Sequence, residues 1–137
     1  MPLGVAEVKR SGSDVTVVGL AYYVQEALAV AGELAKEGIS VEVVDPRTLV
    51  PLDVETIRAS VRKTGRLVIV DEAPPTCSAA AEIAAMVVED AATFKALKAA
   101  PQRVCAAPVP VPYSPTLEKA ALPDRAAIVA AIRRVLE

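Results

Sequence analysis

Two adjacent carboxylates, Asp71 and Glu72, are the residues of this sequence with the clearest chemical potential. They directly follow the apolar run Leu67–Val70, so they would stand together at the end of a strand that is buried on both faces. A carboxylate pair can act as general acid and general base when its surroundings separate the two pKa values. Carboxylates at a strand end are more often solvated or paired with an arginine, and the sequence contains no histidine to share proton transfer. We therefore expect both residues to be structural rather than catalytic.

The other nucleophiles and metal ligands lack partners at useful spacings. Ser78 and Ser114 have no histidine to activate them, and Cys77 has no evident base. Cys77 and Cys105 are too few and too far apart for a zinc site or a redox pair, so we expect two reduced thiols in a cytosolic protein. Neither glycine motif that cradles nucleotide phosphates is present. The sequence predicts no catalytic residue and no cofactor or metal site within this chain alone.

Apolar patterns predict the elements that must position the carboxylates. Short β-branched runs predict strands, and apolar residues recurring three and four apart predict the helices between them. This alternation indicates an α/β fold with a mainly parallel sheet, in which strand 15–19 lies between strands 41–45 and 67–70. The expected strands are 6–10, 15–19, 39–45, 67–70 and 102–106, and the expected helices are 24–34, 53–64, 79–91, 93–99 and a closing helix capped by Asp124.

Ligands of such sheets bind at the carboxyl ends of the strands, where the connections part in opposite directions. Here that crevice would lie between the loops 19–22 and 71–78, which brings Tyr22 and Tyr23 near the two carboxylates. A stand-alone module that binds a small ligand or a nucleotide in this crevice is therefore one interpretation of the chain. The missing phosphate loops count against it.

Length and composition limit the class of protein. A chain of 137 residues that is 53% apolar is expected to form one globular domain, 1–137. A net charge of -2, with one Phe and three Tyr, gives little support to nucleic-acid binding. The longest mostly apolar run, 15–24, is shorter than the roughly 20 residues that a membrane span needs. We expect a soluble protein with no nucleic-acid or membrane partner.

A proline-rich stretch at 107–115 carries four prolines in nine residues and must be extended. It has two interpretations, which the sequence leaves open. The stretch could offer a rigid surface to a partner, or it could be a strap that crosses the domain's own surface to reach the last helix.

Several motifs, in collinear order along nearly the whole chain, are similar to one known family. They resemble the C-terminal transketolase-type domain of the E1 beta subunit of 2-oxo acid dehydrogenases, a group that includes the pyruvate, branched-chain 2-oxo acid and acetoin enzymes. The motifs include Asp45-Pro-Arg-Thr-Leu-Val-Pro-Leu-Asp53, Thr64-Gly-Arg-Leu-Val-Ile-Val-Asp-Glu-Ala-Pro74, Ala81-Glu-Ile-Ala84 and Val109-Pro-Val-Pro-Tyr-Ser-Pro115.

This resemblance implies a three-layer α/β/α domain with a five-stranded, mixed but mostly parallel sheet, whose short first strand is antiparallel at the edge beside 41–45. It also implies that thiamine diphosphate and Mg²⁺ sit in other domains of the parent enzyme, and that this chain alone is inactive. The implied partners are the remaining E1 domains or alpha subunit, a second beta subunit and the E2 acyltransferase. A cytoplasmic location in bacteria, or an organellar matrix in eukaryotes, is expected with them.

The resemblance turns the strand-end loop into a candidate contact surface, and we expect the chain to dimerise. Family members carry a glycine-rich run where this sequence has Cys77-Ser-Ala-Ala80, which puts close backbone approach there in doubt and favours an N-terminally extended helix. The chain is expected to be an excised domain, a split-gene piece or a divergent paralogue. The expected interface residues are Asp71, Glu72, Pro74, Cys77, Glu82, Pro110, Pro112 and Tyr113.

Overall fold

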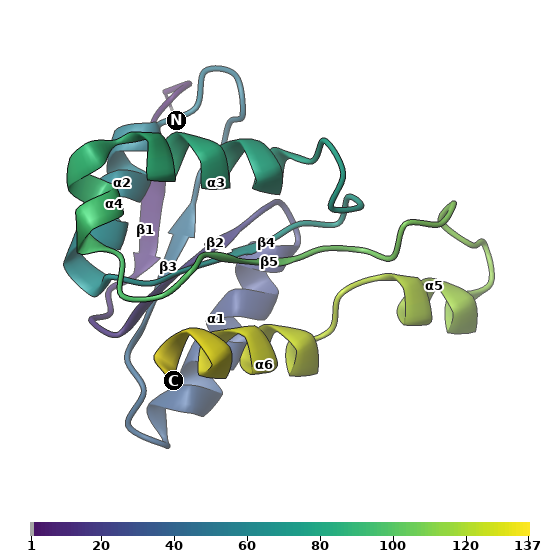
Figure 1. Cartoon of the computed structure of the whole chain (residues 1–137). Coiled ribbons are helices and arrows are strands. Elements are labelled where there is room, and N and C mark those ends of the chain that lie inside the picture. The colour runs from purple at the N-terminus through teal and green to yellow at the C-terminus, as the bar shows by residue number, and fades with distance from the viewer. Residues whose placement is uncertain (1) are drawn as a thin grey trace.

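A computed structural model describes residues 2–137 and places a five-stranded sheet at the centre of the chain (Figure 1). The strand order is β1-β3-β2-β4-β5. β3, β2, β4 and β5 run parallel to one another, and β1 pairs antiparallel with β3 at the edge. The strands are β1 (Glu7–Arg10), β2 (Val15–Gly19), β3 (Val41–Asp45), β4 (Leu67–Val70) and β5 (Gln102–Val104). The predicted mixed sheet with an antiparallel edge strand is confirmed.

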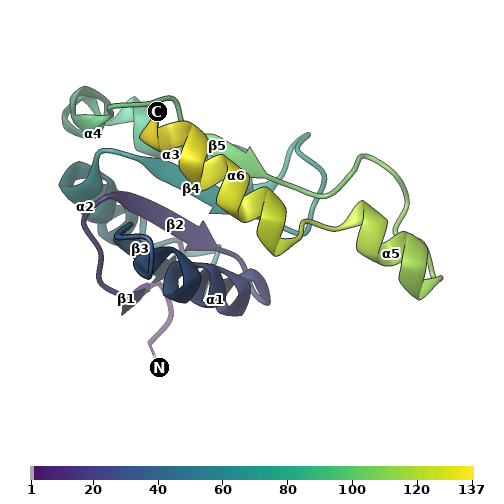
Figure 2. The ribbon, with the colours of Figure 1, turned by 90° about the horizontal axis from the view of Figure 1, so that it is seen from below.

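Helices cover both faces of the sheet and bury its strands. One face packs against α1 (Tyr23–Ala35) and α6 (Arg125–Leu136), which share a core with inward side chains such as Val17 and Val68. The opposite face packs against α2 (Val54–Thr64) and α3 (Ala79–Glu89) through side chains such as Val18 and Ile69. All four β4 residues are buried, so the uninterrupted apolar run is the mark of a strand covered on both sides. The predicted three layers are confirmed (Figure 2).

Local signals in the sequence set several helix ends. Asp53 caps α2 by accepting a hydrogen bond from the Thr56 amide at 3.1 Å, and Asp124 caps α6 through the Ala127 amide at 2.8 Å. Gly65 ends α2 in the left-handed conformation, with φ 76°. Gly19 ends β2 for another reason: a Cβ there would lie 2.7 Å from the Tyr23 carbonyl oxygen. A glycine is needed because α1 turns back directly over the strand end.

A buried polar network ties β3 to α2. Glu42 is 1% exposed. Its side chain accepts hydrogen bonds from the Ser60 hydroxyl at 2.5 Å and the Gly12 amide at 3.1 Å, and it pairs with Lys63. The Thr16 hydroxyl lies 2.7 Å from that of Ser60. Burial raises the pKa of Glu42, but the hydrogen bonds from Lys63, Ser60 and Gly12 outweigh it and hold the pKa below its usual range.

The structure corrects three element predictions. The predicted helix 79–91 ends at Glu89, because Asp90 is extended and caps a separate helix, α4 (Ala91–Ala96), through the Thr93 amide at 2.8 Å. The last strand stops at Val104 rather than at residue 106. A helix that the sequence patterns did not predict, α5 (Pro115–Ala121), follows the proline-rich stretch. Among residues 2–137, no helix is long and apolar enough to cross a membrane.

Candidate subunit interface

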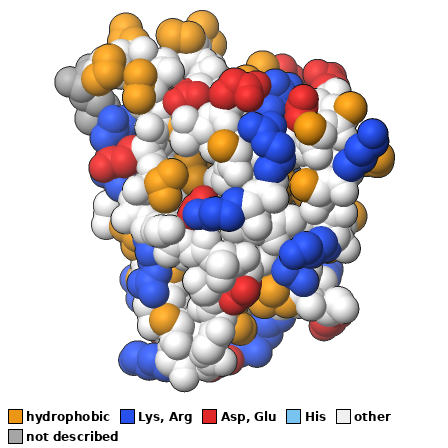
Figure 3. Space-filling view, turned by 90° about the vertical axis from the view of Figure 1, so that its left-hand side faces the viewer, with side chains coloured by type: hydrophobic (Ala, Val, Ile, Leu, Met, Phe, Trp, Pro, Cys, Tyr) orange, Lys and Arg blue, Asp and Glu red, His pale blue; other side chains and the backbone are white. Residues whose placement is uncertain are grey.

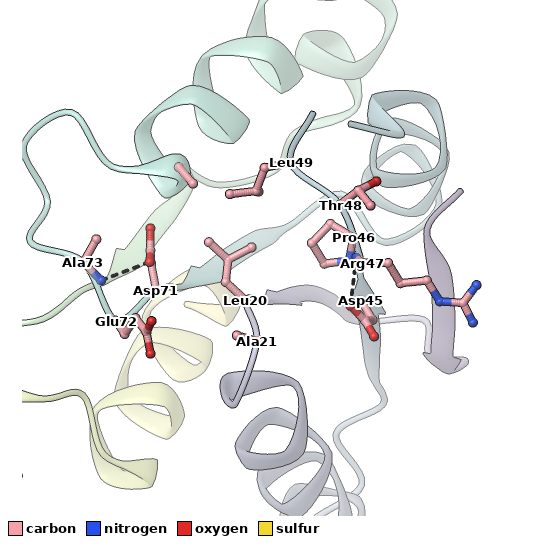
Figure 4. Close-up of a pocket in the computed structure, with 11 residues that line it drawn as sticks. Leu20, Ala21, Asp45, Pro46, Arg47, Thr48, Leu49, Asp71, Glu72 and Ala73 are labelled. Carbon is pink, nitrogen blue, oxygen red and sulfur yellow. Dashed lines mark hydrogen bonds between the residues drawn. The ribbon is translucent and has the colours of Figure 1, made fainter. Parts of the chain in front are cut away.

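Loops from three neighbouring strands enclose a cavity of about 570 Å³ at the carboxyl edge of the sheet (Figure 4). The loops follow β2, β3 and β4, so the crevice predicted between 19–22 and 71–78 exists and extends to the loop after β3. Its walls are mainly apolar, and its polar side chains are three carboxylates, one hydroxyl and one arginine. The lining residues are Leu20, Ala21, Asp45, Pro46, Arg47, Thr48, Leu49, Asp71, Glu72, Ala73 and Ala79.

Asp71 and Glu72 have different roles although they are adjacent. The Asp71 side chain accepts hydrogen bonds from the Ala73 amide at 3.0 Å and from the Ala80 amide at 3.1 Å, and the residue is 4% exposed. Asp71 thus fastens the first turn of α3 to the end of β4. Glu72 is exposed and has no comparable bond within residues 2–137. The two carboxylates are not an acid–base pair that faces a common substrate.

The loop after β3 is fixed by a second carboxylate. The Arg47 amide donates to Asp45 Oδ1 at 2.9 Å, and the Arg47 side chain points away from the cavity to pair with Glu7 on β1 (Figure 4). Hydrogen bonds from Lys9 and Arg47 lower the pKa of the Glu7 carboxyl. Arg47 Nε is buried without a hydrogen-bond partner among the described residues. Asp45 therefore orders the loop that follows β3.

Each of the three loops contains one non-glycine residue with positive φ. These residues are Ala21 (φ 49°), Arg47 (φ 60°) and Cys77 (φ 56°). Left-handed backbone is unfavourable for residues with a Cβ, and such strain is often found at functional surfaces. Cys77 stands in the segment where the resemblance leads us to expect glycine. Ser78 then caps α3 through the Ala81 amide at 3.2 Å, so α3 begins at Ala79 and does not extend further towards the N-terminus.

Residues 108–120, which we name the arm, project away from the sheet with α5 near their tip (Figures 1 and 2). The arm has a closed neck, because the Ala107 amide donates to the Ala121 carbonyl at 2.8 Å. No residue of α5 is buried. The arm's large apolar side chains Val109, Val111, Tyr113 and Leu117 are all exposed. The strap interpretation is therefore wrong, since this stretch does not lie across the domain's own surface.

A groove of about 650 Å³ lies between the C-terminal part of the arm and the start of α1. It is lined by Tyr22, Tyr23 and Glu72, among other residues, so Glu72 borders both hollows of this face. The Tyr23 hydroxyl donates to the Pro123 carbonyl at 3.2 Å, and burial followed by the nearby Glu72 charge raises the pKa of Tyr23 to about 12. Arg125 Nε lies 2.8 Å from Glu26 Oε2, and this bond lowers the pKa of Glu26.

The predicted interface residues are mostly accessible. Asp71 is the buried exception and Pro112 is half-buried; the exposed residues are Glu72, Pro74, Cys77, Glu82, Pro110 and Tyr113. They fall into two groups, one on the loop after β4 with the start of α3, and one on the arm. Cys105 is half-buried, and burial raises the pKa of its thiol.

Sequence reasoning missed an apolar patch at the N-terminal edge of the same face. The Gly4 amide donates to the Thr48 hydroxyl at 3.0 Å, which joins the N-terminal segment to the loop after β3. Leu3 is 76% exposed and Val50 is 92% exposed. Figure 3 shows a group of hydrophobic side chains at the upper left of the molecule. The signal was present in the consecutive apolar residues Leu49-Val-Pro-Leu52, which lie between turn residues rather than within an element.

Comparison with known proteins identifies the domain. A family model described as the transketolase C-terminal domain matches residues 4–128. The chain is 49% identical to the beta subunit of acetoin:2,6-dichlorophenolindophenol oxidoreductase from Cupriavidus necator, across 100% of this chain and 40% of that protein. It is 48% identical to the mitochondrial pyruvate dehydrogenase E1 component subunit beta-1 from Arabidopsis thaliana, across 98% of this chain and 36% of that protein.

A solved structure supports the same assignment. The chain superposes on a split gene transketolase, solved as an inactive beta4 tetramer, with a TM-score of 0.85 and 28% identity. This match covers 99% of the chain and 43% of the solved one. The chain therefore spans well under half the length of the relatives that it matches. Fold, sequence motifs and family match agree, and the chain belongs to the transketolase C-terminal domain family, with E1 beta subunits of acetoin and pyruvate dehydrogenases among its homologues.

Proposed function

We propose that this chain is the C-terminal assembly and subunit-interface domain of a thiamine diphosphate-dependent 2-oxo acid dehydrogenase of the E1 beta type. The observation that carries the proposal is a match through the whole chain to only a part of each relative, in beta subunits of two different enzymes. Because the names of these two enzymes give different substrates, acetoin and pyruvate, their shared part is assigned to a role other than the choice of substrate. On this proposal residues 1–137 form a single domain that is inactive alone.

Thiamine diphosphate and Mg²⁺ would be bound by the rest of the enzyme. The cavity at the carboxyl edge does not fit a diphosphate, because Asp45, Asp71 and Glu72 line it and would repel phosphate charge. The one basic residue of the lining, Arg47, turns its side chain away to pair with Glu7. No cluster of three or more potential metal ligands occurs within residues 2–137. On this proposal the residues of this chain serve contact and positioning.

The proposed interface is the carboxyl-edge face, bounded by the arm at one end and by the patch around Leu3 and Val50 at the other. Exposed apolar side chains that gather on one side of a domain mark a surface that a partner covers. The partners on this proposal are the remaining E1 domains or alpha subunit, a second beta subunit and the E2 acyltransferase. The beta4 tetramer of the split gene transketolase supports association between copies. We place the assembly in the bacterial cytoplasm, or in an organellar matrix as for the mitochondrial relatives.

A chimera tests the proposal. The matching 40% of the Cupriavidus necator beta subunit is replaced by this chain, and the product is expressed with the rest of that enzyme. The chimera should assemble, and Glu72→Arg should weaken assembly at least tenfold. The matched control is Glu89→Arg, an equal charge change on an exposed residue at the other end of α3, which should leave assembly unchanged. A folded chimera that does not assemble would contradict the proposal, and equal effects of the two variants would contradict the chosen face.

A second candidate function is the stand-alone small-ligand module. The cavity at the predicted crevice favours it, since about 570 Å³ is enough for a small organic molecule. The acidic lining disfavours nucleotides and favours neutral or cationic compounds. A ligand that raises the melting temperature of the chain, and whose effect disappears when Ala21→Trp fills the cavity, would support this candidate over the first.

A further inference from the structure

The arm is held rigidly at its base and presents its tip outward. The neck bond between Ala107 and Ala121 closes the loop, and the Ala106 amide donates to the Ala73 carbonyl at 3.1 Å, which extends the pairing of β5 with β4. On the other side of the neck, the Tyr23 hydroxyl donates a hydrogen bond to the Pro123 carbonyl. These bonds set where the arm leaves the domain. None of the arm's residues lines the cavity of its own chain.

The tip of the arm is uncharged and apolar. No charged residue occurs between positions 107 and 117. Tyr113 is 103% exposed, and Val111 and Leu117 are more than half exposed. A projection with an exposed aromatic ring and no charge is unfavourable in water, and burial against a partner surface would stabilise it. The arm presents one aromatic ring, three aliphatic side chains and the hydroxyls of Tyr113, Ser114 and Thr116, of which only that of Tyr113 is carried on a ring.

The cavity offers the complementary groups. Leu20 and Leu49 point into it from opposite loops and supply apolar walls (Figure 4). Asp45 uses Oδ1 for the Arg47 amide, which leaves Oδ2 as an acceptor, and the Glu72 carboxylate is free of donors among the described residues. An apolar slot with unused carboxylate oxygens suits a phenol, whose ring packs on the walls and whose hydroxyl donates to a carboxylate.

We propose that two copies of this chain exchange arms, so that Tyr113 of each copy enters the cavity of the other, between Leu20 and Leu49, and donates its hydroxyl to Asp45 or Glu72. This rests on the proposed assembly role and names the contact by which a second beta-type chain is recognised. A two-fold axis makes the exchange reciprocal, with two arms and two cavities filled.

The area involved is sufficient for a specific dimer. A buried aromatic side chain contributes about 200 Å², and the three partly exposed aliphatic side chains bring each arm to about 400 Å². Counting both arms and the surfaces that receive them, the exchange buries about 1,600 Å², the size of a standard specific interface.

Photo-crosslinking tests the exchange directly. The full chain carrying p-benzoylphenylalanine at position 113 is mixed with an isotopically labelled copy and irradiated, and the joined peptides are identified by mass spectrometry. We expect crosslinks between copies to the peptides that contain Leu20–Ala21, Asp45–Leu49 or Asp71–Ala73, which line the cavity. Crosslinks to any other part of the partner copy, or only within one chain, would overturn the exchange.

Sedimentation measurements give the energetic counterpart. Tyr113→Ala should weaken dimerisation at least a hundredfold, and Tyr113→Phe by about tenfold or more, because one hydrogen bond is lost in each of the two copies. Phe94→Ala is the matched control, since Phe94 is 61% exposed on α4 and outside both the arm and the cavity, and it should leave dimerisation unchanged. A monomer at all concentrations, or equal effects of Tyr113→Ala and Phe94→Ala, would overturn the exchange. The chimera's assembly is measured independently: a chimera that assembles while the crosslinks miss the cavity refutes the exchange alone, whereas a folded chimera that does not assemble refutes the proposed function.

Discussion

Replacing Asp71 by alanine should destabilise the domain by about 3 kcal/mol. Two backbone amides, those of Ala73 and Ala80, donate to this carboxylate, and Ala80 is completely buried. A hydrogen bond to a charged acceptor contributes about 1.5–3 kcal/mol, and a buried amide left without an acceptor loses the most. The Ala73 amide lies nearer to the surface and can turn to water, so it adds only about 1 kcal/mol.

Urea unfolding followed by circular dichroism measures this loss. With a denaturant slope of about 2 kcal/mol per molar, the midpoint should fall by about 1.5 M. Asp71→Asn keeps one accepting oxygen and should lose roughly half as much. Glu72→Ala is the matched control and should change the unfolding free energy by less than about 0.5 kcal/mol, because Glu72 is exposed. If Asp71→Ala changes stability no more than Glu72→Ala does, the separation of the two carboxylates into structural and surface roles is wrong.

Three further predictions concern stability. The native pKa of the Glu42 carboxyl is lowered, so its contribution to the free energy of unfolding is complete above the unfolded pKa near 4.5 and is lost as the pH falls through the native pKa. Urea unfolding from about pH 6 to pH 3 should therefore show a smaller loss of stability for Glu42→Gln than for the parent chain. Parallel curves for the two proteins would contradict this. Cys77→Gly should stabilise by roughly 0.5–1 kcal/mol by relieving the left-handed backbone, whereas Cys77→Ala should not, and equal thermal midpoints for both variants would argue against strain. Replacing 108–120 by two glycines should lower the melting temperature by less than about 4 °C, because the neck is already closed and α5 buries nothing; unfolding of the shortened chain at room temperature would refute an independent arm.

Features that depend on short stretches of sequence could be predicted. The strand β4 follows from four consecutive apolar residues, and the caps Asp53 and Asp124 follow from their position ahead of periodic helices. Their physical causes act within a few residues, so a local pattern contains them. The crevice could also be located, because parallel strands bring their carboxyl ends to one edge whatever the side chains are.

Features that no apolar pattern marks, or that depend on contacts between distant residues, could not be predicted. The helix α5 has no buried face, so no apolar periodicity marks it, and Pro115 at its start is the one local sign. The break between α3 and α4 is set by Asp90, which caps α4. The alanines around it favour a continuous helix, so the sequence pattern does not show the break. The role of Asp71 depends on α3 folding back over the end of β4, which brings Ala80 to its carboxylate. Only the fold shows that one of two adjacent acids is structural.

Turnover is the measurement that tests the central claim most directly. This chain alone and the Cupriavidus chimera assembled with its enzyme are each given thiamine diphosphate, Mg²⁺, a 2-oxo acid or acetoin, and an artificial electron acceptor. Decarboxylation or oxidation should occur only in the assembled chimera, because this chain supplies the contact surface and the rest of the enzyme supplies the chemistry. Turnover by this chain alone would contradict its assignment as an assembly domain.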